Sequence, residues 1–425
     1  MVVRGIVKIP ATRTIAGITA AMEKKDYAHY IHKDSCRLSR WTARESFQYM
    51  YARPWHKVSD FYLDLVRGGG YSSLCSLFSS EKNKSKFVLE YCHGDEESNL
   101  VNIPFEKGKG RCERITFKIV LSYHGVSFDG WQKQPGLNTV QGFVKLFSLQ
   151  LKERSLPVEG CVVVAGRTDK GVTALQQVCS FYTWRKDVKC GDLKDAINAA
   201  APGKLRVLFI SEVPRVFHPN FAAKWRRYFY IFPLEESLHI QVNDDQMDHP
   251  SCKDEDDGFL QQQEEHMDGD CANKYIDNVN IQMKPSSFSV DKVNQLLCRL
   301  EGRSLSYRVF ARDTKASRSS GPPTECFIFH ARAVESKLPC IIKDFTEEVK
   351  VMCVELVANR FLRKMVRVLV STAIREAAAG ADADALLNLM NATCRRATAP
   401  PAPPEGLCLV DVGYGDFNHQ ISSIL

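Results

Sequence analysis

The sequence predicts an α+β protein whose two halves share one large sheet. Two observations lead to this class. Two separate stretches of the chain combine short apolar strands with amphipathic helices. Between them lies an acidic, glutamine-rich spacer, which is too polar to bury a core of its own.

The first half begins where Ile115, Phe117 and Ile119 alternate with polar residues in the period of a strand. Asn138 is the expected cap of a helix with one apolar face. That face comprises Val140, Phe143, Val144, Phe147 and Leu151. Further strands are predicted at 161–164, 174–184, 205–213 and 226–234, with a short helix at 192–200.

The second half begins with a helix that ends at Leu300 and is capped by Ser289 or Asp291. A longer helix is expected over 361–379, closed by Gly380. Another helix follows from Asp382 or Asp384, and strands are predicted at 326–334, 349–358 and 407–412.

These patterns divide the chain into five segments. Residues 1–111 form a poorly defined N-terminal extension that contains a predicted helix from Ser59 to Val66. Residues 112–240 form the N-terminal subdomain and 285–416 the C-terminal one. Residues 241–284 between them are predicted to be an acidic, disordered insertion, and 417–425 form a tail.

Charge is unevenly distributed along the chain. The net charge is +7, yet residues 243–270 hold eleven acids and one base, Lys253. The remainder therefore carries about +17, which favours a polyanionic partner such as nucleic acid or an anionic membrane face. A basic protein with no such partner stays an alternative on charge alone.

The fifteen cysteines include no C-x-x-C pair, and several lie in apolar runs. Buried free thiols in a reducing compartment explain them better than disulfides or zinc. The eleven histidines lack metal-binding spacing, so no metal site is expected. With no run of ~18 apolar residues, no membrane span is expected either. These features favour the cytoplasm or nucleus, while the basic start of the chain leaves an organelle transit peptide open.

The segment most indicative of chemistry is Gly166-Arg-Thr-Asp-Lys-Gly171-Val172. It lies in a turn between two predicted strands, so that Asp169 projects from a rigid sheet. A phosphate-binding loop is one interpretation, but that loop needs Gly-Lys-Ser/Thr leading into a helix, and a strand follows here. Taken alone, Asp169 would more often cap its own turn.

Other segments accompany this motif in a fixed order: Gly130-Trp-Gln-Lys-Gln134, Phe217-His218, Arg226-Arg-Tyr228-Phe-Tyr230, Phe361-Leu-Arg-Lys-Met-Val-Arg367 and Pro404-Glu-Gly-Leu407. From about residue 115 to 414 the sequence therefore resembles the TruA family of tRNA pseudouridine synthases. The resemblance implies that family's α+β fold. Two α/β subdomains share a large, mostly antiparallel sheet, with helices on one side and an active-site cleft between the halves.

The resemblance also implies roles for four residues. Asp169 matches the catalytic aspartate, and Arg367 matches the helical arginine that pairs with it. Arg167 matches the arginine linked to displacing the target base, and Tyr228 the tyrosine that packs on the uracil ring. The implied activity is isomerisation of uridine in tRNA, in the anticodon stem-loop at positions 38–40. No cofactor is implied, and members of the family are often homodimers.

Each implied role has a physical reason. The reaction breaks the N1–C1′ bond and rejoins the base through C5, so one carboxylate suffices as nucleophile or base. A cation within ~4–6 Å keeps that carboxylate ionised. The target base must leave the stack, and an arginine plane can fill the gap while an aromatic face holds the base.

Plainer interpretations remain for single residues. Tyr228 alone would be a half-buried strand aromatic, and Arg367 a solvated helix cation or a phosphate contact. Two departures from the family pattern concern the substrate: His124 replaces the aspartate of Tyr-Asp-Gly, and Asn220 replaces the arginine of Phe-His-Ala-Arg. An RNA-binding module without catalysis is the alternative function, because the same basic surface would serve it.

Overall fold

The computed structural model describes residues 32, 34–69, 74, 114–144, 162–236, 283–312, 324–342, 345–392, 394–418 and 424–425. The predicted acidic insertion lies outside the described residues, and its predicted disorder stays a prediction. The helix expected after Asn138 is described only over 140–144, so its positions Phe147 and Leu151 also lie outside.

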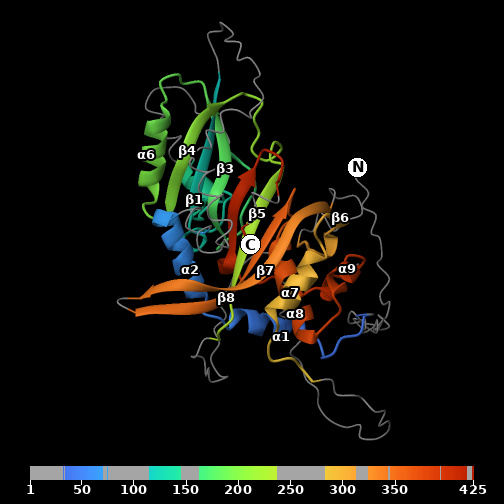
Figure 1. Ribbon diagram of the computed structural model, residues 1–425. Coiled ribbons are helices and arrows are strands. Elements are labelled where there is room, and N and C mark those ends of the chain that lie inside the picture. The colour runs from blue at the N-terminus through green and yellow to red at the C-terminus, as the bar shows by residue number, and fades with distance from the viewer. Residues whose placement is uncertain are drawn as a thin grey trace, which may run out of the picture.

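The described strands form one sheet in the order β4-β1-β3-β9-β5-β8-β7-β6, with β2 paired to β3 at the side (Figure 1). The strands are β1 Ile115–Tyr123, β2 Val163–Val164, β3 Thr173–Thr183, β4 Leu205–Val213, β5 Trp225–Pro233, β6 Arg303–Ser306, β7 Glu325–Ile342, β8 Phe345–Ala358 and β9 Leu407–Gly413. Their pairings are antiparallel, except that β3 and β9 run parallel at Thr173 and Cys408. The predicted α+β class and mostly antiparallel sheet are confirmed.

The sheet is continuous across the two halves. β9 comes from the C-terminal half but lies between β3 and β5 of the N-terminal half. β5 in turn pairs with β8 through Tyr228 and Leu356. Every residue of β5 is buried because the sheet is covered on both faces there. The centre of the sheet is therefore made by strands from both halves, and the residues with implied roles lie around it.

The principal described helices are α1 Ala43–Tyr51, α2 Trp55–Asp64, α6 Cys190–Ala200, α7 Val290–Cys298, α8 Met365–Ala379 and α9 Ala385–Leu389. Ser289 caps α7, because its hydroxyl accepts from the N–H of Lys292. Gly380 ends α8 at φ +67°, in the left-handed region that glycine adopts freely. Asp384 precedes α9, as one of the two alternatives expected.

Helix α8 begins later than the sequence pattern indicates. The expected start was residue 361, but the first helical residue is Met365. Lys364 lies in the left-handed region at φ +58°, so the backbone cannot continue the helix toward Phe361. The turn at 361–364 instead leads the chain from β8 into the helix, and Arg367 falls in the first helical turn.

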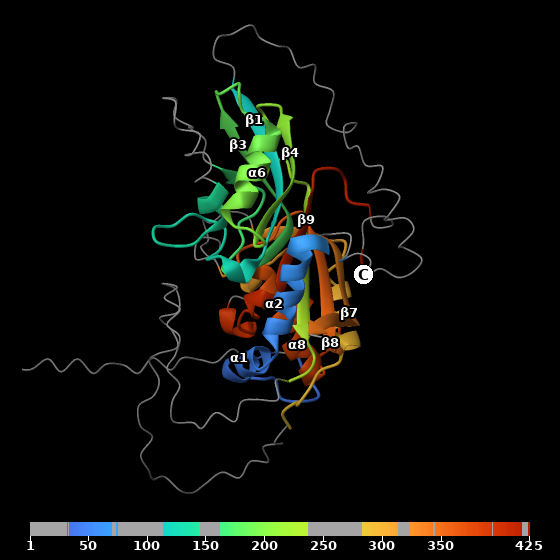
Figure 2. The same cartoon turned by 90° about the vertical axis from the view of Figure 1, so that its left-hand side faces the viewer.

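The helices lie on both faces of the sheet (Figures 1 and 2). Helices α6, α7 and α8 pack on the face to which Tyr228 and Tyr230 contribute, as expected for helices on one side. Helix α2 covers the opposite face, where Phe61 packs in one cluster with Phe229 and Ile231. The one-sided arrangement therefore holds for α6, α7 and α8, and α2 departs from it.

Part of the predicted N-terminal extension packs on the body of the protein. Helices α1 and α2 are formed from residues 43–64, and α2 lies across the junction of the two halves (Figure 2). Thr42 caps α1 in a capping box with Glu45. The helix predicted from Ser59 to Val66 is α2, which begins earlier at Trp55 and is followed by a π-helical turn at Leu65–Gly69. Among the described residues, no helix is both long and apolar enough to cross a bilayer.

Candidate active site

Asp169 lies on the loop between β2 and β3, at the centre of the shared sheet. Its side chain is 32% exposed, so the carboxylate can reach a ligand while it is partly shielded from water. The loop turns back on itself, because the Val172 N–H donates to the Asp169 carbonyl at 3.2 Å. Gly171 has φ +82°, and a β-carbon there would meet the Pro404 ring at 3.0 Å. Only glycine satisfies both conditions.

Buried hydrogen bonds hold the backbone of the Asp169 loop in place. Thr168 and Tyr123 join their hydroxyls at 2.7 Å. Gln177 donates to the Gly166 carbonyl at 2.8 Å, and Trp131 donates its backbone N–H to the Thr168 carbonyl at 3.1 Å. Because these contacts fix Gly166 and Thr168 within the loop, the backbone that presents the Asp169 carboxylate is held in place.

Arg367 approaches Asp169 from the first turn of α8. Its Nη1 lies 3.6 Å from Asp169 Oδ2, and its side chain is only 9% exposed. Its Nε donates to the Ala402 carbonyl at 2.6 Å, which fixes the guanidinium plane. A buried arginine beside a partly exposed carboxylate brings opposite charges together at the surface of the site. The predicted Asp169–Arg367 pairing is therefore present in the fold, and Arg367 is not a solvated helix cation.

Residues 397–406, the proline segment, link Arg367 to the loop. The segment passes along α8, where Ser371 donates to the Pro400 carbonyl at 2.6 Å. It then passes β5, where Tyr230 donates to the Pro403 carbonyl at 2.8 Å. Next, Pro404 packs against the Gly171 position of the Asp169 loop. The segment thus holds the helix, the central strand and the loop in one arrangement.

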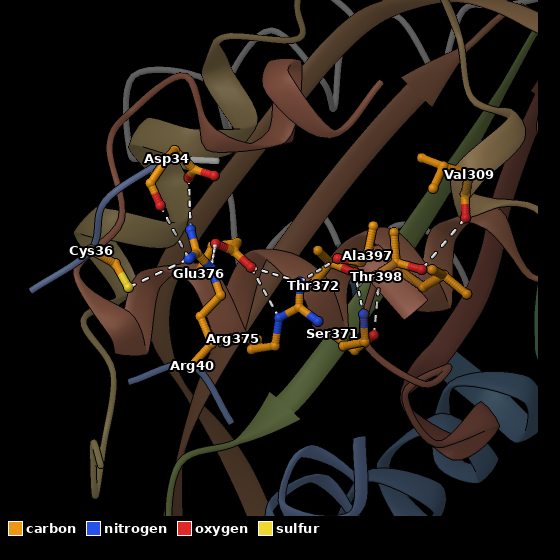
Figure 3. A network of polar contacts seen from close by, with 12 residues as sticks. Asp34, Cys36, Arg40, Val309, Ser371, Thr372, Arg375, Glu376, Ala397 and Thr398 are labelled. Atoms are coloured by element: carbon orange, nitrogen blue, oxygen red, sulfur yellow. Dashed lines mark hydrogen bonds and ion pairs between the residues drawn. The ribbon is translucent and has the colours of Figure 1, made fainter. Parts of the chain in front are cut away.

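The other end of α8 is anchored by buried charges (Figure 3). Arg40 and Arg375 point toward Glu376 from two sides, with N–O distances of 2.6 Å and 2.7 Å. Arg375 also donates to the Ala397 carbonyl at 2.5 Å, at the start of the proline segment. Arg40 reaches Asp34 as well, at 2.7 Å. The network therefore ties the N-terminal segment to the helix that presents Arg367.

Tyr228 lies on β5 with 8% of its surface exposed. Its ring meets Phe361 edge-on at a centroid distance of 5.0 Å. Its hydroxyl would be 3.8 Å from a β-carbon at Gly166, so the ring borders the Asp169 loop. Burial raises the pKa of Tyr228 to about 12, with Arg226 opposing and the nearby Asp169 adding to the rise. The phenol is therefore neutral at physiological pH.

Arg167 differs from the other three residues. It is on the same loop as Asp169 but is exposed. The structure thus brings Asp169, Arg367 and Tyr228 together and places Arg167 at the solvent side of the loop. That position suits a side chain that acts on an incoming ligand, because it leaves the guanidinium accessible.

Arg226 is a residue of the site to which the sequence pattern assigned no role. It is 7% exposed. It donates to the Ala165 carbonyl at 2.8 Å and 3.1 Å, to the Asn359 carbonyl at 2.9 Å and to Asn220 Oδ1 at 2.6 Å. Arg226 thereby clamps the start of the Asp169 loop to β5. The signal available in the sequence was two adjacent arginines inside an otherwise apolar strand, which require buried partners.

The two departures from the family pattern have structural roles. His124 joins the N-terminal half to α2, with its ring 2.9 Å from Ser127 Oγ and 3.0 Å from Ser59 Oγ. Burial lowers the pKa of His124, so the ring is neutral. Asn220 accepts from Arg226 and supports the clamp. Neither residue contacts Asp169 through a described interaction.

No three His, Cys, Asp or Glu side chains gather as they would around a metal ion within the part of the chain that the structure describes. The described cysteines are free thiols. Burial raises the pKa of Cys326 to about 11, so this thiol stays protonated. The described site presents the Asp169 carboxylate, the Arg367 guanidinium and the neutral Tyr228 phenol.

Comparisons with known proteins show what this chain is similar to. The sequence model of a family described as tRNA pseudouridine synthase matches residues 312–415, which include Arg367. A tRNA pseudouridine synthase A of Dictyoglomus thermophilum is 37% identical over 131 residues, 31% of this chain and 52% of that protein. Proteins of the same name are similar over longer stretches. That of Chlorobaculum tepidum is 27% identical over 70% of this chain and 98% of its own. The protein from Rippkaea orientalis is 26% identical over 73% of this chain and 87% of its own length.

The chain is thus similar to tRNA pseudouridine synthases, at higher identity over part of its length and at lower identity over most of it. These similarities support the resemblance to the TruA family of tRNA pseudouridine synthases that the sequence motifs indicate. The local alignment spans about half of the Dictyoglomus relative, whereas the Chlorobaculum alignment spans nearly all of that protein.

Proposed function

We propose that this chain isomerises uridine to pseudouridine in tRNA, with Asp169 as the nucleophile. The observation that supports this most is the ion pair between Asp169 and the buried Arg367 at 3.6 Å, bordered by the ring of Tyr228. A partly exposed carboxylate held in place beside a cation is accessible to a substrate carbon and can serve as a nucleophile.

The proposed reaction uses Asp169, Tyr228 and Arg167. The N1–C1′ bond of uridine breaks and a C5–C1′ bond forms. The proton that C5 loses is balanced by one that N1 gains, so nothing is oxidised or reduced. Asp169 provides the oxygen that engages the sugar or ring, and Tyr228 provides a flat neutral surface for the detached base. Arg167, at the exposed side of the loop, fills the space left by the flipped nucleotide.

The target region proposed is the anticodon stem-loop, at positions 38–40. Its support is the family resemblance of the motifs around Asp169, Tyr228 and Arg367. The charge of about +17 outside residues 243–270 supports an RNA partner in general, because phosphate contacts dominate RNA affinity. Homodimerisation is proposed on the same family resemblance.

The test is pseudouridine formation on unmodified tRNA transcripts. Carbodiimide labelling followed by primer extension maps each new pseudouridine as a stop. Wild type should give stops in the anticodon arm, and Asp169→Asn should give none while its Kd for tRNA stays within about threefold. Asp195→Asn, the same change at an exposed position of α6, is the matched control and should keep full activity.

Two results would overturn the proposal. Turnover by Asp169→Asn would remove Asp169 as nucleophile. Tight tRNA binding by the wild type with no product on any transcript would favour the RNA-binding module without catalysis. Stops outside the anticodon arm would keep the reaction and contradict only the proposed positions.

A further inference from the structure

A pair of stacked rings faces solvent in the segment between β4 and β5. His218 and Phe221 lie with ring centroids 4.1 Å apart and planes 23° apart. Phe221 is 83% exposed, and Val216 in the same segment is 80% exposed. Exposed apolar side chains favour contact with a ligand, since their hydration is unfavourable.

The segment holds these rings in a fixed position. The Phe221 N–H donates to His218 Nδ1 at 3.2 Å. The Ala222 N–H donates to the His218 carbonyl at 2.9 Å. Tyr414 donates to the Pro219 carbonyl at 3.0 Å. A ring that is ordered before binding loses little entropy when a second ring stacks on it.

The same segment is joined directly to the active site. The Nη2 of Arg226 donates both to Asn220 Oδ1 at 2.6 Å and to the Ala165 carbonyl at 2.8 Å. Ala165 begins the loop that presents Asp169. The segment that carries the exposed rings and the start of the Asp169 loop are therefore held by one side chain, that of Arg226.

The charge around the rings indicates what would stack there. Residues 214–224 contain Arg215 and Lys224 and no acid, and Lys224 pairs with Asp416 at 2.8 Å, so Arg215 is the main cation of the segment. Lys118 lies 5.0 Å from the Tyr414 ring centroid, beneath the same segment. Cations next to an exposed aromatic suit a molecule that combines flat bases with phosphates, which is unpaired RNA.

We propose that Phe221, backed by His218, is a stacking platform for an unpaired base of the substrate RNA close to the target uridine. The proposal rests on the proposed function and names a part of the substrate, a single-stranded nucleotide, that the site requires. Base–aromatic stacking is strong enough that loss of the ring should weaken RNA binding on the order of 10-fold or more.

The test compares Kd values for an unmodified tRNA transcript by filter binding, without any turnover. Phe221→Ala should raise Kd about 10-fold, and Phe221→Trp should restore it because a ring is present again. Phe209→Ala is the matched control, because Phe209 is another exposed phenylalanine (56%) but lies on β4 at the edge of the sheet. It should leave Kd unchanged. Circular dichroism and thermal unfolding verify that each variant folds.

A second measurement identifies the base. Abasic substitutions are placed one at a time at the unpaired nucleotides of the transcript. When the base that stacks on Phe221 is removed, the wild type should bind the transcript more weakly. Phe221→Ala, which lacks the ring, should bind the abasic and the intact transcript equally. Unchanged Kd in Phe221→Ala would overturn the platform, as would an equal loss of affinity for a fully paired RNA duplex. A switch from dimer to monomer on sedimentation with RNA affinity unchanged would assign the surface to self-association instead. Because binding is measured apart from product, an inactive enzyme would leave this test intact.

Discussion

The Nη1 of Arg367 lies 3.6 Å from Oδ2 of Asp169, although the two residues are almost two hundred positions apart in the sequence. The pair joins the helix of one half to the loop of the other across the shared sheet. Arg367 is also held by the Ala402 carbonyl, so its guanidinium is directed at the carboxylate before any substrate arrives.

Two substitutions of Arg367 should distinguish the effect of its positive charge on kcat from the effect of its fixed orientation. Arg367→Lys keeps a cation but loses the Nε bond to Ala402, and Arg367→Met loses both. We expect kcat to fall roughly 10-fold for lysine and at least 100-fold for methionine, because preorganised electrostatic interactions supply effects of this size. Single-turnover kinetics on tRNA measure both. Equal kcat in wild type and Arg367→Met would show that the ion pair has no part in the reaction.

At Tyr228 the ring rather than the hydroxyl should matter. Tyr228→Phe should lower kcat only a few-fold, whereas Tyr228→Ala removes the stacking surface and should cost much more. The raised pKa of about 12 adds a pH criterion: wild type and Tyr228→Phe should share the same kcat–pH profile between pH 7 and 10, since the phenol does not ionise there. Equal losses in the phenylalanine and alanine variants would instead implicate the hydroxyl.

Arg226 and Arg227 provide a matched pair on opposite faces of β5. Arg226 clamps Ala165, whereas Arg227 pairs with Glu355 at 3.1 Å on the other face. Arg226→Lys cannot make the same set of bonds, and kcat should fall at least 10-fold with a smaller change in KM. Arg227→Lys should lower the unfolding temperature yet keep kcat per folded molecule. If both variants lose kcat equally, Arg226 has only a structural role.

The buried network at Glu376 should contribute far more stability than a surface pair. Glu376→Gln deprives Arg40 and Arg375 of a carboxylate that is 1% exposed, and we expect a loss of about 3–5 kcal/mol in the free energy of unfolding. Glu45→Gln is the control. Glu45 pairs with Lys284, and the two side chains are 40% and 45% exposed. The loss in the free energy of unfolding should therefore be about 0–1 kcal/mol. Urea unfolding measures both, and similar losses would mean that the N-terminal segment is not anchored through Glu376.

Stability should depend on pH through His330. Burial alone would lower the pKa of His330, but its contacts with Glu301 and Glu355 raise it to about 9 from an ordinary 6.5. The folded state therefore holds this proton more tightly than the unfolded state. The resulting stabilisation is complete below pH 6.5 and is lost as pH rises through 9, by an amount on the order of 3 kcal/mol.

The measurement is urea unfolding of wild type and His330→Gln at pH 6 and pH 9.5. The difference in unfolding free energy between the two proteins should be larger at pH 6. A difference that is the same at both pH values would show that His330 does not change its protonation between them.

The local elements of this fold could be predicted because their signals are local. Alternation at Ile115 and Phe117 indicated β1, and β4 was predicted over its observed range. The start of α8 was missed because Phe361 and Leu362 continue a helical apolar pattern, while the left-handed backbone of Lys364 breaks it. Periodicity reports which face is apolar and carries no information on such a turn.

The sequence by itself predicted the α+β class correctly and singled out Asp169, Tyr228 and Arg367 as candidate site residues, because those motifs are short and keep their order along the chain. Only the tertiary structure decided how they meet. The insertion of β9 between β3 and β5, the bond from Arg367 to Ala402 and the clamp by Arg226 all join residues that are distant in sequence. Buried polar groups must find hydrogen-bond partners when the two halves pack around one sheet. Which partners they find depends on packing across the whole molecule, and local sequence does not encode it.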